Sequence, residues 1–375
     1  SREPGDQSGR CRGVQRRRVL LAVGGLALAA TPAACSDSGG TPGIRIAEVP
    51  VQVDRYDTVA AAVGWQRGFL AVTAHGLVYR SDGERWIRLN PTGLVDGLGT
   101  GPDSDESGTE TRVDGLAAGD GLLLAVGTRR TEITEDDIRF SPLIWRSTDG
   151  ENWETVAPAG LTAVSFDFVV ADGDGFVAFG TEEVPPPPGY EPADEAEGEL
   201  PATIGVTSAW RSADGTTWDK FGDNVLPPGE NSVESVASVA IAGDQLLASL
   251  GTECTGCYDD YNLVLARSDD GGGTWQELDQ RGLDDVEQAN TDVIPRLATF
   301  AQGFVAVATS GDGDDTEVTL WRSPDGESWT DKTRLGGPGD YEYGESIDAV
   351  AATDTGVIAL ELRGNRLFVW EVDLR

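Results

Sequence analysis

The nine residues WRSTDGENW, at positions 145–153, recur along the chain with little change. Close copies are WRSADGTTW at 210–218 and WRSPDGESW at 321–329, and looser copies are YRSDGERW at 79–86 and ARSDDGGGTW at 266–275. A short apolar segment precedes each copy, such as GFVAFGT, which begins at Gly175. The serines of successive copies are 55 to 66 residues apart, which indicates a protein built from repeated structural units.

Each repeat predicts four antiparallel strands. Two apolar segments are joined by a tight turn that contains Gly and Asp, and a loop of variable length follows them. The third strand ends at the Trp-Arg-Ser sequence, and the fourth begins at the Trp after an Asp-Gly turn. Five such units and a sixth, partial one predict an all-β fold, namely a six-bladed β-propeller with four-stranded antiparallel blades.

The last repeat contains only three predicted strands, the third being NRLFVWEVDLR at 365–375. A blade with three strands would have an open sheet edge. The apolar segment IRIAEVPVQV, at 44–53, belongs to no repeat. We therefore expect this N-terminal strand to take the outer position of the last blade and to close the ring.

The recurring turn resembles the Asp box, or BNR repeat, of sialidase-like propellers, and the repeats lie between residues 45 and 375. Ser268, Asp270, Gly272 and Trp275 have the full spacing of this motif, whereas the other close copies lack one residue before Gly. The positions that match are Ser147, Asp149, Trp153, Ser212, Asp214, Trp218, Ser268, Asp270, Trp275, Ser323, Asp325 and Trp329. Asp accepts hydrogen bonds from backbone N–H groups, Gly supplies a positive φ, and Trp packs with its indole N–H satisfied nearby. A structural role is thus predicted for these residues.

Residues 1–34 are predicted to be an export signal, because three arginines at 16–18 precede an apolar run at 19–30 that is too short to span a bilayer. Cys35 follows two alanines and resembles the lipidated cysteine of a bacterial lipoprotein; an ordinary signal peptide is the alternative. Residues 35–43 are expected to be a flexible tether, and residues 44–375 the propeller. The chain is therefore expected to be extracytoplasmic and lipid-anchored to the outer face of the cytoplasmic membrane. Its composition suggests an actinobacterial source.

The chain is strongly acidic, with 64 acidic and 28 basic residues and a formal net charge of −36. Such a charge repels nucleic-acid phosphates and anionic lipids, which excludes nucleic-acid binding and leaves membrane contact to the lipid anchor alone. No cofactor or metal site is expected. The acidic segments at 171–175 and 310–317 leave calcium open, although neither has the spacing of an EF-hand loop. Cys254 and Cys257 are predicted to form a disulfide in an oxidising compartment, and the protein is expected to be a monomer.

The variable loops are expected to lie on one face of the propeller, because the connections between the second and third strands share a face with the links between blades. Long irregular loops, among them 127–141 and 251–261, are predicted there, and binding residues concentrate on such loops. The candidate ligand-binding residues are Arg129, Arg130, Arg139, Tyr258, Asp259 and Tyr261.

The predicted function is binding or scaffolding at the cell envelope, with an envelope protein or a glycan as the partner. The alternative is a glycoside hydrolase of the sialidase type, and the sequence does not settle whether the chain is an enzyme. The resemblance implies an Arg triad, a Tyr nucleophile assisted by Glu, and an Asp acid/base for that alternative. The candidate residues are Arg45, Tyr341, Glu342 and Tyr343. A convergent Arg cluster in the central channel would favour the sialidase, and an acidic or aromatic mouth would favour the binding module.

Overall fold

The chain folds into six four-stranded antiparallel sheets. The structure, a computed structural model, describes residues 43–51, 57–82, 85–94, 109–134, 137–163, 165–173, 175–186, 203–223, 233–253, 261–279, 283, 295–310, 317–336 and 347–374. They belong to one compact unit, Gly40–Arg375. None of the described segments forms a helix long and apolar enough to cross a membrane.

Five blades are continuous in sequence, with the inner strand first and the outer strand last. Blade 1 consists of β2 (Val59–Trp65), β3 (Gly68–Thr73), β4 (Val78–Ser81) and β5 (Trp86–Arg88). Blade 2 consists of β6 (Thr109–Gly119), β7 (Leu122–Thr134), β8 (Asp137–Ser147) and β9 (Glu154–Val156). Blade 3 consists of β10 (Ser165–Asp172), β11 (Gly175–Val184), β12 (Ile204–Ser212) and β13 (Asp219–Asp223). Blade 4 consists of β14 (Val233–Ala242), β15 (Gln245–Glu253), β16 (Tyr261–Ser268) and β17 (Gln276–Glu277). Blade 5 consists of β18 (Arg296–Phe300), β19 (Gly303–Ser310), β20 (Glu317–Ser323) and β21 (Thr330–Gly336).

Blade 6 joins the two ends of the described chain. It consists of β22 (Ala349–Ala352), β23 (Gly356–Arg363), β24 (Arg366–Asp373) and the N-terminal β1 (Ile44–Pro50), in the sheet order β1-β24-β23-β22. The outer strand β1 pairs antiparallel with β24 from Ile44↔Val372 to Pro50↔Arg366. The predicted closure of the last blade is therefore confirmed.

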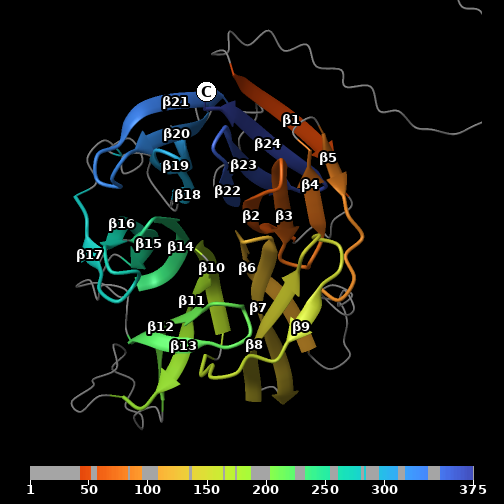
Figure 1. Ribbon diagram of the computed structural model, residues 1–375, viewed down its shortest axis with the longest axis vertical. Helices are drawn as coiled ribbons and strands as arrows, with labels where there is room; N and C mark the ends of the chain where they lie inside the picture. The colour runs from red at the N-terminus through yellow and green to blue at the C-terminus, as the bar shows by residue number, and fades with distance from the viewer. Residues whose placement is uncertain are drawn as a thin grey trace, which may run out of the picture. The chain divides into compact units, whose positions relative to one another are not determined.

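The six inner strands surround a central channel, with each inner strand in contact with the inner strands of both neighbouring blades. Figure 1 shows β2, β6, β10, β14, β18 and β22 closest to the axis of the ring. We call the end of the propeller at which the chain enters the inner strands the loop face. It also carries the connections between second and third strands, whereas the Asp-box turns lie at the opposite end. The predicted six-bladed propeller is confirmed.

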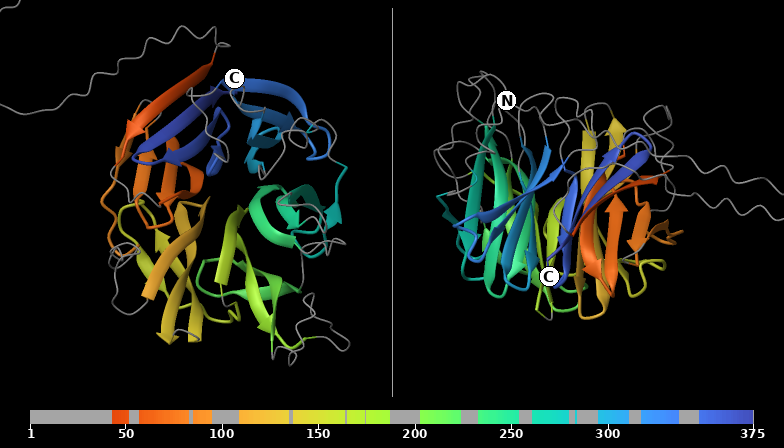
Figure 2. Two further views of the ribbon diagram at one scale, coloured as in Figure 1. Left: turned by 180° about the vertical axis from the view of Figure 1, so that it is seen from behind. Right: turned by 90° about the horizontal axis from the view of Figure 1, so that it is seen from above.

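One expected loop is instead regular structure. The segment 127–141 was expected to be an irregular loop, but β7 continues to Thr134 and β8 begins at Asp137. Thr134 pairs with Asp137 at the tip of the hairpin. This prediction was wrong because alternating Arg, Thr, Ile and Glu side chains suit an exposed strand as well as they suit a loop. In the right-hand view of Figure 2 the yellow strands of this hairpin reach beyond the ends of most other strands.

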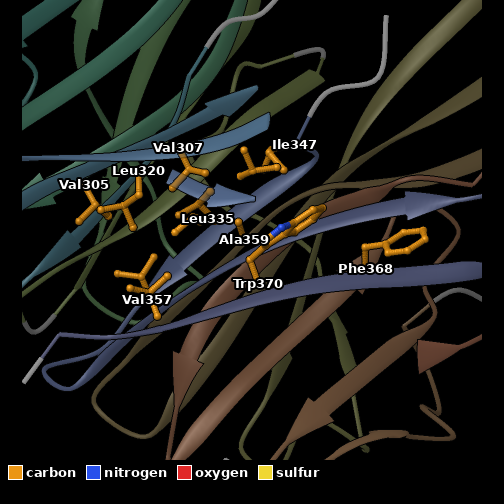
Figure 3. Packing of buried hydrophobic residues seen from close by; sticks show 12 residues of the cluster. Val305, Val307, Leu320, Leu335, Ile347, Val357, Ala359, Phe368 and Trp370 are labelled. Carbon is orange, nitrogen blue, oxygen red and sulfur yellow. The ribbon is translucent and has the colours of Figure 1, made fainter. Parts of the chain in front are cut away.

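Apolar side chains fill the spaces between neighbouring blades. The strand β19 is buried on both faces, from Phe304 to Ala308, because blades 4 and 6 cover it from the two sides. Figure 3 shows the cluster between blades 5 and 6, in which Val305, Val307 and Leu320 face Val357 and Trp370. This packing explains why the second strand of each repeat is an almost continuous apolar run.

The Asp-box turn is held by a short set of hydrogen bonds. In blade 2 the Ser147 hydroxyl accepts a hydrogen bond from the Gly150 N–H at 2.9 Å and donates one to Asp149 Oδ1 at 3.1 Å. The same Oδ1 accepts from the backbone N–H groups of Glu151 and Asn152, at 2.8 and 2.7 Å. Equivalent bonds occur at Ser212, Ser268 and Ser323. Hydrogen bonds to the ionised carboxyl lower the pKa of Asp214 and of Asp270 to about 2.

The Asp boxes also join neighbouring blades. A Cβ built at Gly150 of blade 2 would lie 2.5 Å from Leu70 Cδ1 of blade 1, and the residue has a φ of +79°. The box glycine is therefore required by close packing as well as by the turn. Arg211 of blade 3 donates to the carbonyl of Gly271 in the Asp-box turn of blade 4, at 3.3 Å.

The tryptophans of the boxes differ in how their indole N–H groups are satisfied. Trp153 and Trp275 donate to the carbonyls of Gly150 and Gly272, at 3.1 Å in both cases. The expectation was wrong for Trp218 and Trp329, whose buried indole nitrogens have no hydrogen-bond partner among the described residues. These two rings pack against apolar side chains of the preceding blade instead.

Candidate functional site

The central channel contains a cavity of about 350 Å³ that all six inner strands line. The N-terminal ends of these strands lie at the loop face. A residue near the start of an inner strand therefore lies toward the loop-face mouth of the channel. The charged residues that line the described cavity are Asp114, Arg296 and Asp348.

Three aspartates take the same position in three of the six inner strands. Each inner strand ends in a tight hairpin, and its last paired residue gives a common reference point. The residue five positions before this reference point is, from blade 1 to blade 6, Ala60, Asp114, Asp167, Ala237, Pro295 and Asp348. We call Asp114, Asp167 and Asp348 the carboxylate ring.

A β-bulge marks this position in the first four blades. The pairing register between the first and second strands shifts at Ala60, Asp114, Asp167 and Ala237. A bulge leaves one residue out of the ladder and changes the direction of its side chain, and bulges are frequent next to functional sites. The bulge therefore sets Asp114 and Asp167 apart from the regular alternation of their strands.

Asp114 and Asp167 come from adjacent blades and influence each other. Burial raises the pKa of Asp114 to about 6, although the Arg112 guanidinium, with Nε 2.6 Å from Oδ1, and the Thr128 hydroxyl oppose the shift. Burial and then the charge of Asp114 raise the pKa of Asp167 to about 6. Within the described residues no hydrogen-bond donor or cation contacts the Asp167 carboxyl. Asp167 is thus a partly desolvated carboxyl without a compensating group among the described residues.

The Asp348 carboxyl, unlike that of Asp167, accepts hydrogen bonds from described residues. These bonds link blades 6 and 1. Asp348 Oδ2 accepts hydrogen bonds from the backbone N–H groups of Leu362 at 2.7 Å and Val59 at 3.3 Å. Burial nevertheless raises the pKa of Asp348 to about 6, and nearby Asp57 contributes to the increase. Asp57 itself is buried, and its Oδ1 lies 3.0 Å from Nδ1 of His75, in the connection between β3 and β4.

The Arg296 guanidinium donates its hydrogen bonds to backbone carbonyls of the channel wall. Its Nε donates to the Ile347 carbonyl at 3.1 Å, and its Nη1 donates to the Ala237 carbonyl. The guanidinium therefore fastens blades 4, 5 and 6 together. Both contacts use N–H groups that a ligand carboxylate would otherwise need, and the described channel holds no convergent Arg cluster.

None of the described residues that were predicted from the sequence lines this cavity. Arg129, Arg130 and Arg139 lie together on the β7–β8 hairpin of the loop face. Arg45 lies on the outermost strand of blade 6, where it binds the Glu371 carboxylate. Tyr261 begins β16. Cys35, Cys254, Cys257, Tyr258, Asp259, Tyr341, Glu342 and Tyr343 lie outside the described residues.

Sequence reasoning missed the carboxylate ring, although a signal for it is present. The segments VDGLAAG at 113–119, FDFVVAD at 166–172 and IDAVAAT at 347–353 each have Asp as the second residue of a mostly apolar segment. A single acidic residue at a fixed place in buried strands indicates a specific use, because burying a charge is costly. No group of three or more metal-ligating side chains occurs among the described residues.

Comparisons with known proteins identify the architecture. No protein-family model matches the chain, and no curated protein matches its sequence. Among solved structures, an α-L-arabinanase of Penicillium chrysogenum complexed with arabinobiose is 14% identical with a TM-score of 0.52, over 86% of this chain and 95% of that one. The Trypanosoma rangeli sialidase is 13% identical with a TM-score of 0.50, over 88% of this chain and 60% of that one. YCF48, bound to D1 peptide, is 11% identical with a TM-score of 0.44, over 89% and 98%. At these identities the similarity to the arabinanase and the sialidase shows the propeller fold alone.

Proposed function

We propose that this chain is a binding propeller that holds a cationic group of its ligand at the loop-face mouth of the central channel. The observation that carries the proposal is Asp167, a half-buried carboxyl beside a second carboxyl and without a donor among the described residues. A buried charge is expensive unless it is paired, and such groups concentrate at functional sites. Asp167 does not itself line the cavity, but the neighbouring Asp114 does, so an ammonium or guanidinium group of the ligand bound beside Asp114 would supply a counter-charge to both carboxyls.

The dimensions of the channel suggest how the ligand is bound. A cavity of about 350 Å³ has the size of a small-molecule pocket, so it admits one side chain or one small amine and no folded partner. The partner in this proposal is an envelope protein that inserts a Lys or Arg side chain, or a glycan that bears an amino group. Export and lipid anchoring, which the first 35 residues predict, would place the propeller where such partners occur.

The test is an NMR titration of residues 36–375 with N-acetyl-lysine amide and with its neutral counterpart, N-acetyl-norleucine amide. The lysine derivative should bind at pH 7.5, and binding should weaken at pH 5, because the carboxyls with a pKa of about 6 become protonated there. Asp167→Asn should weaken binding at least tenfold. The matched control is Asp172→Asn, which removes the same charge at the other end of β10, where Asp172 pairs with Arg211 at 3.2 Å. Equal binding of the two amides, or equal loss in both variants, would refute the proposal.

A second candidate function, glycoside hydrolysis, is favoured by the pair Asp114 and Asp167. Such hydrolysis uses one protonated and one ionised carboxyl, and the two groups here have different surroundings. Asp114 has Arg112 beside it, whereas Asp167 has no compensating group within the described residues. A panel of nitrophenyl glycosides tests this function, since turnover abolished by both Asp114→Asn and Asp167→Asn would establish it. The same panel should include a sialoside, for which Arg45 is poorly placed on the outer strand β1.

A further inference from the structure

The hairpin of β7 and β8 extends beyond its own blade. These strands contain 13 and 11 residues, and they are the longest second and third strands of any blade in the described chain. The outer strand β9 pairs only with Ile144, Trp145 and Arg146 of β8. Within the described residues, the segment of β8 from Asp137 to Leu143 therefore has a strand partner on one side only. Its other side is a sheet edge at the outside of the propeller.

The two faces of this extension differ in chemistry. Residues that pair directly across antiparallel strands share a face. Arg130 pairs with Phe140, and Glu132 pairs with Ile138, so these four side chains lie on one face. Arg129 pairs with Ser141, and Thr131 pairs with Arg139, so these four lie on the other. One face therefore presents Ile138 and Phe140 beside the Arg130–Glu132 ion pair, whereas the other presents two arginines among hydroxyl groups. We call the first the apolar face, after its exposed Ile138 and Phe140.

The apolar side chains of this face are exposed to an unusual degree. Ile138 and Phe140 are 41% and 51% exposed; Ile133, at the end of β7, is 49% exposed but has no paired residue that places it on this face. Only two further large hydrophobic residues of the described chain, Ile46 and Ile87, are comparably exposed. A free edge with exposed apolar side chains is a template for pairing with another strand, and proteins normally protect such edges.

We propose that the edge of β8 from Asp137 to Leu143 is a docking site for an extended segment of a partner protein with alternating acidic and apolar residues. The added strand would form backbone hydrogen bonds with the free edge. Because side chains alternate along a strand, its apolar residues would lie beside Ile138 and Phe140, and its acidic residues would lie beside Arg139 on the opposite face. The alternation follows directly from the register of β7 and β8.

Charge distinguishes this occupant from a lipid surface. A chain with a formal net charge of −36 is repelled by anionic headgroups, and the arginines of one hairpin are too few to reverse that repulsion. A single added strand brings its acidic groups against the arginine-bearing face alone. The docking site is separate from the carboxylate ring and does not depend on the function proposed for it.

The test measures binding of a fluorescent, end-capped peptide (Val-Glu)₄ to the propeller by anisotropy, with (Val-Lys)₄ as the comparison peptide. The acidic peptide should bind and the basic one should not. Arg139→Glu and Phe140→Ser should each weaken binding at least tenfold. The matched controls are Arg67→Glu in the exposed turn between β2 and β3 and Ile87→Ser on β5, which should bind as the parent does. Circular dichroism confirms that all four variants are folded.

Three results would overturn the proposal. The first is the absence of (Val-Glu)₄ binding by the folded parent, and the second is equal binding by the parent and Arg139→Glu. The third is a dimer of the parent in sedimentation velocity that Phe140→Ser dissociates, which would assign the edge to a second copy of this chain. Asp167→Asn should bind the peptide normally, so a failure here is distinguishable from a failure of the channel proposal.

Discussion

Replacement of Asp167 by Asn is expected to stabilise the fold at neutral pH, although it removes a residue of the candidate site. The fold raises the pKa of this carboxyl from 3.8 to about 6, first through burial and then through the charge of Asp114. Each pKa unit corresponds to about 1.4 kcal/mol, so the ionised carboxyl lowers the free energy of unfolding by up to about 3 kcal/mol. Asn keeps the shape without the charge, but its amide would also have no partner among the described residues, so a gain of about 1 to 2 kcal/mol is expected.

The gain in stability from Asp167→Asn is expected to depend on pH. A carboxyl whose folded pKa is raised binds a proton more readily in the folded state than in the unfolded state. Its destabilising effect is therefore complete above a pH of about 6 and disappears as the pH falls toward 3.8. The gain from Asp167→Asn should be largest at pH 8 and much smaller at pH 4.5.

The assay is urea unfolding of the parent and the variant at both pH values. Comparing the two proteins at each pH isolates this carboxyl, because all other titrating groups are common to both. Asp114→Asn should gain less, because it also loses the Arg112 ion pair at 2.6 Å. A loss of stability in Asp167→Asn at pH 8, or an equal gain at both pH values, would refute the reasoning.

Three further predictions concern the scaffold. Ser212→Ala removes the acceptor of the Gly215 N–H at 2.8 Å, leaves a buried donor unpaired, and should lower the free energy of unfolding by about 1 to 3 kcal/mol in urea denaturation. Gly150→Ala should lower it by about 2 to 4 kcal/mol in the same assay, because φ is +79° and the new Cβ would lie 2.5 Å from Leu70 Cδ1; a neutral result would contradict the close packing. Deletion of residues 44–50 exposes the edge of β24 and should produce oligomers in size-exclusion chromatography, whereas a monomer of unchanged melting temperature would show that β1 does not close the ring.

The fold could be predicted from the sequence because the interactions that form each turn are short-range and are repeated in the blades. Ser147, Asp149 and Gly150 satisfy one another within a single turn, so the same letters recur wherever that turn recurs. The position of β1 followed from counting strands and from the cost of an open edge. The packing of Gly150 against Leu70 was not accessible, because it depends on how one blade faces the next.

The candidate site was less accessible because it depends on burial and register. Arg129 and Arg139 could be recognised as cations on a connection of the loop face, but their shared face follows only from the pairing of β7 with β8. Asp114 and Asp167 come from different blades, and their interaction requires the two inner strands to lie side by side. A sequence window that contains one inner strand shows an Asp in a mostly apolar segment but not the carboxyl of the neighbouring blade.

The repeats provide an internal comparison that bears on the role of the carboxylate ring. Blades 1 and 4 have the same bulge as blades 2 and 3, yet the residue there is Ala60 or Ala237. The bulge and the inner strand therefore form without a carboxyl. Asp348 has a structural task, because it accepts backbone N–H groups from blades 6 and 1. Asp167 has no such structural role among the described residues. Its desolvation lowers the stability of the fold at a position where blades 1 and 4 have alanine. That contrast is the reason for seeking a ligand at Asp167 first.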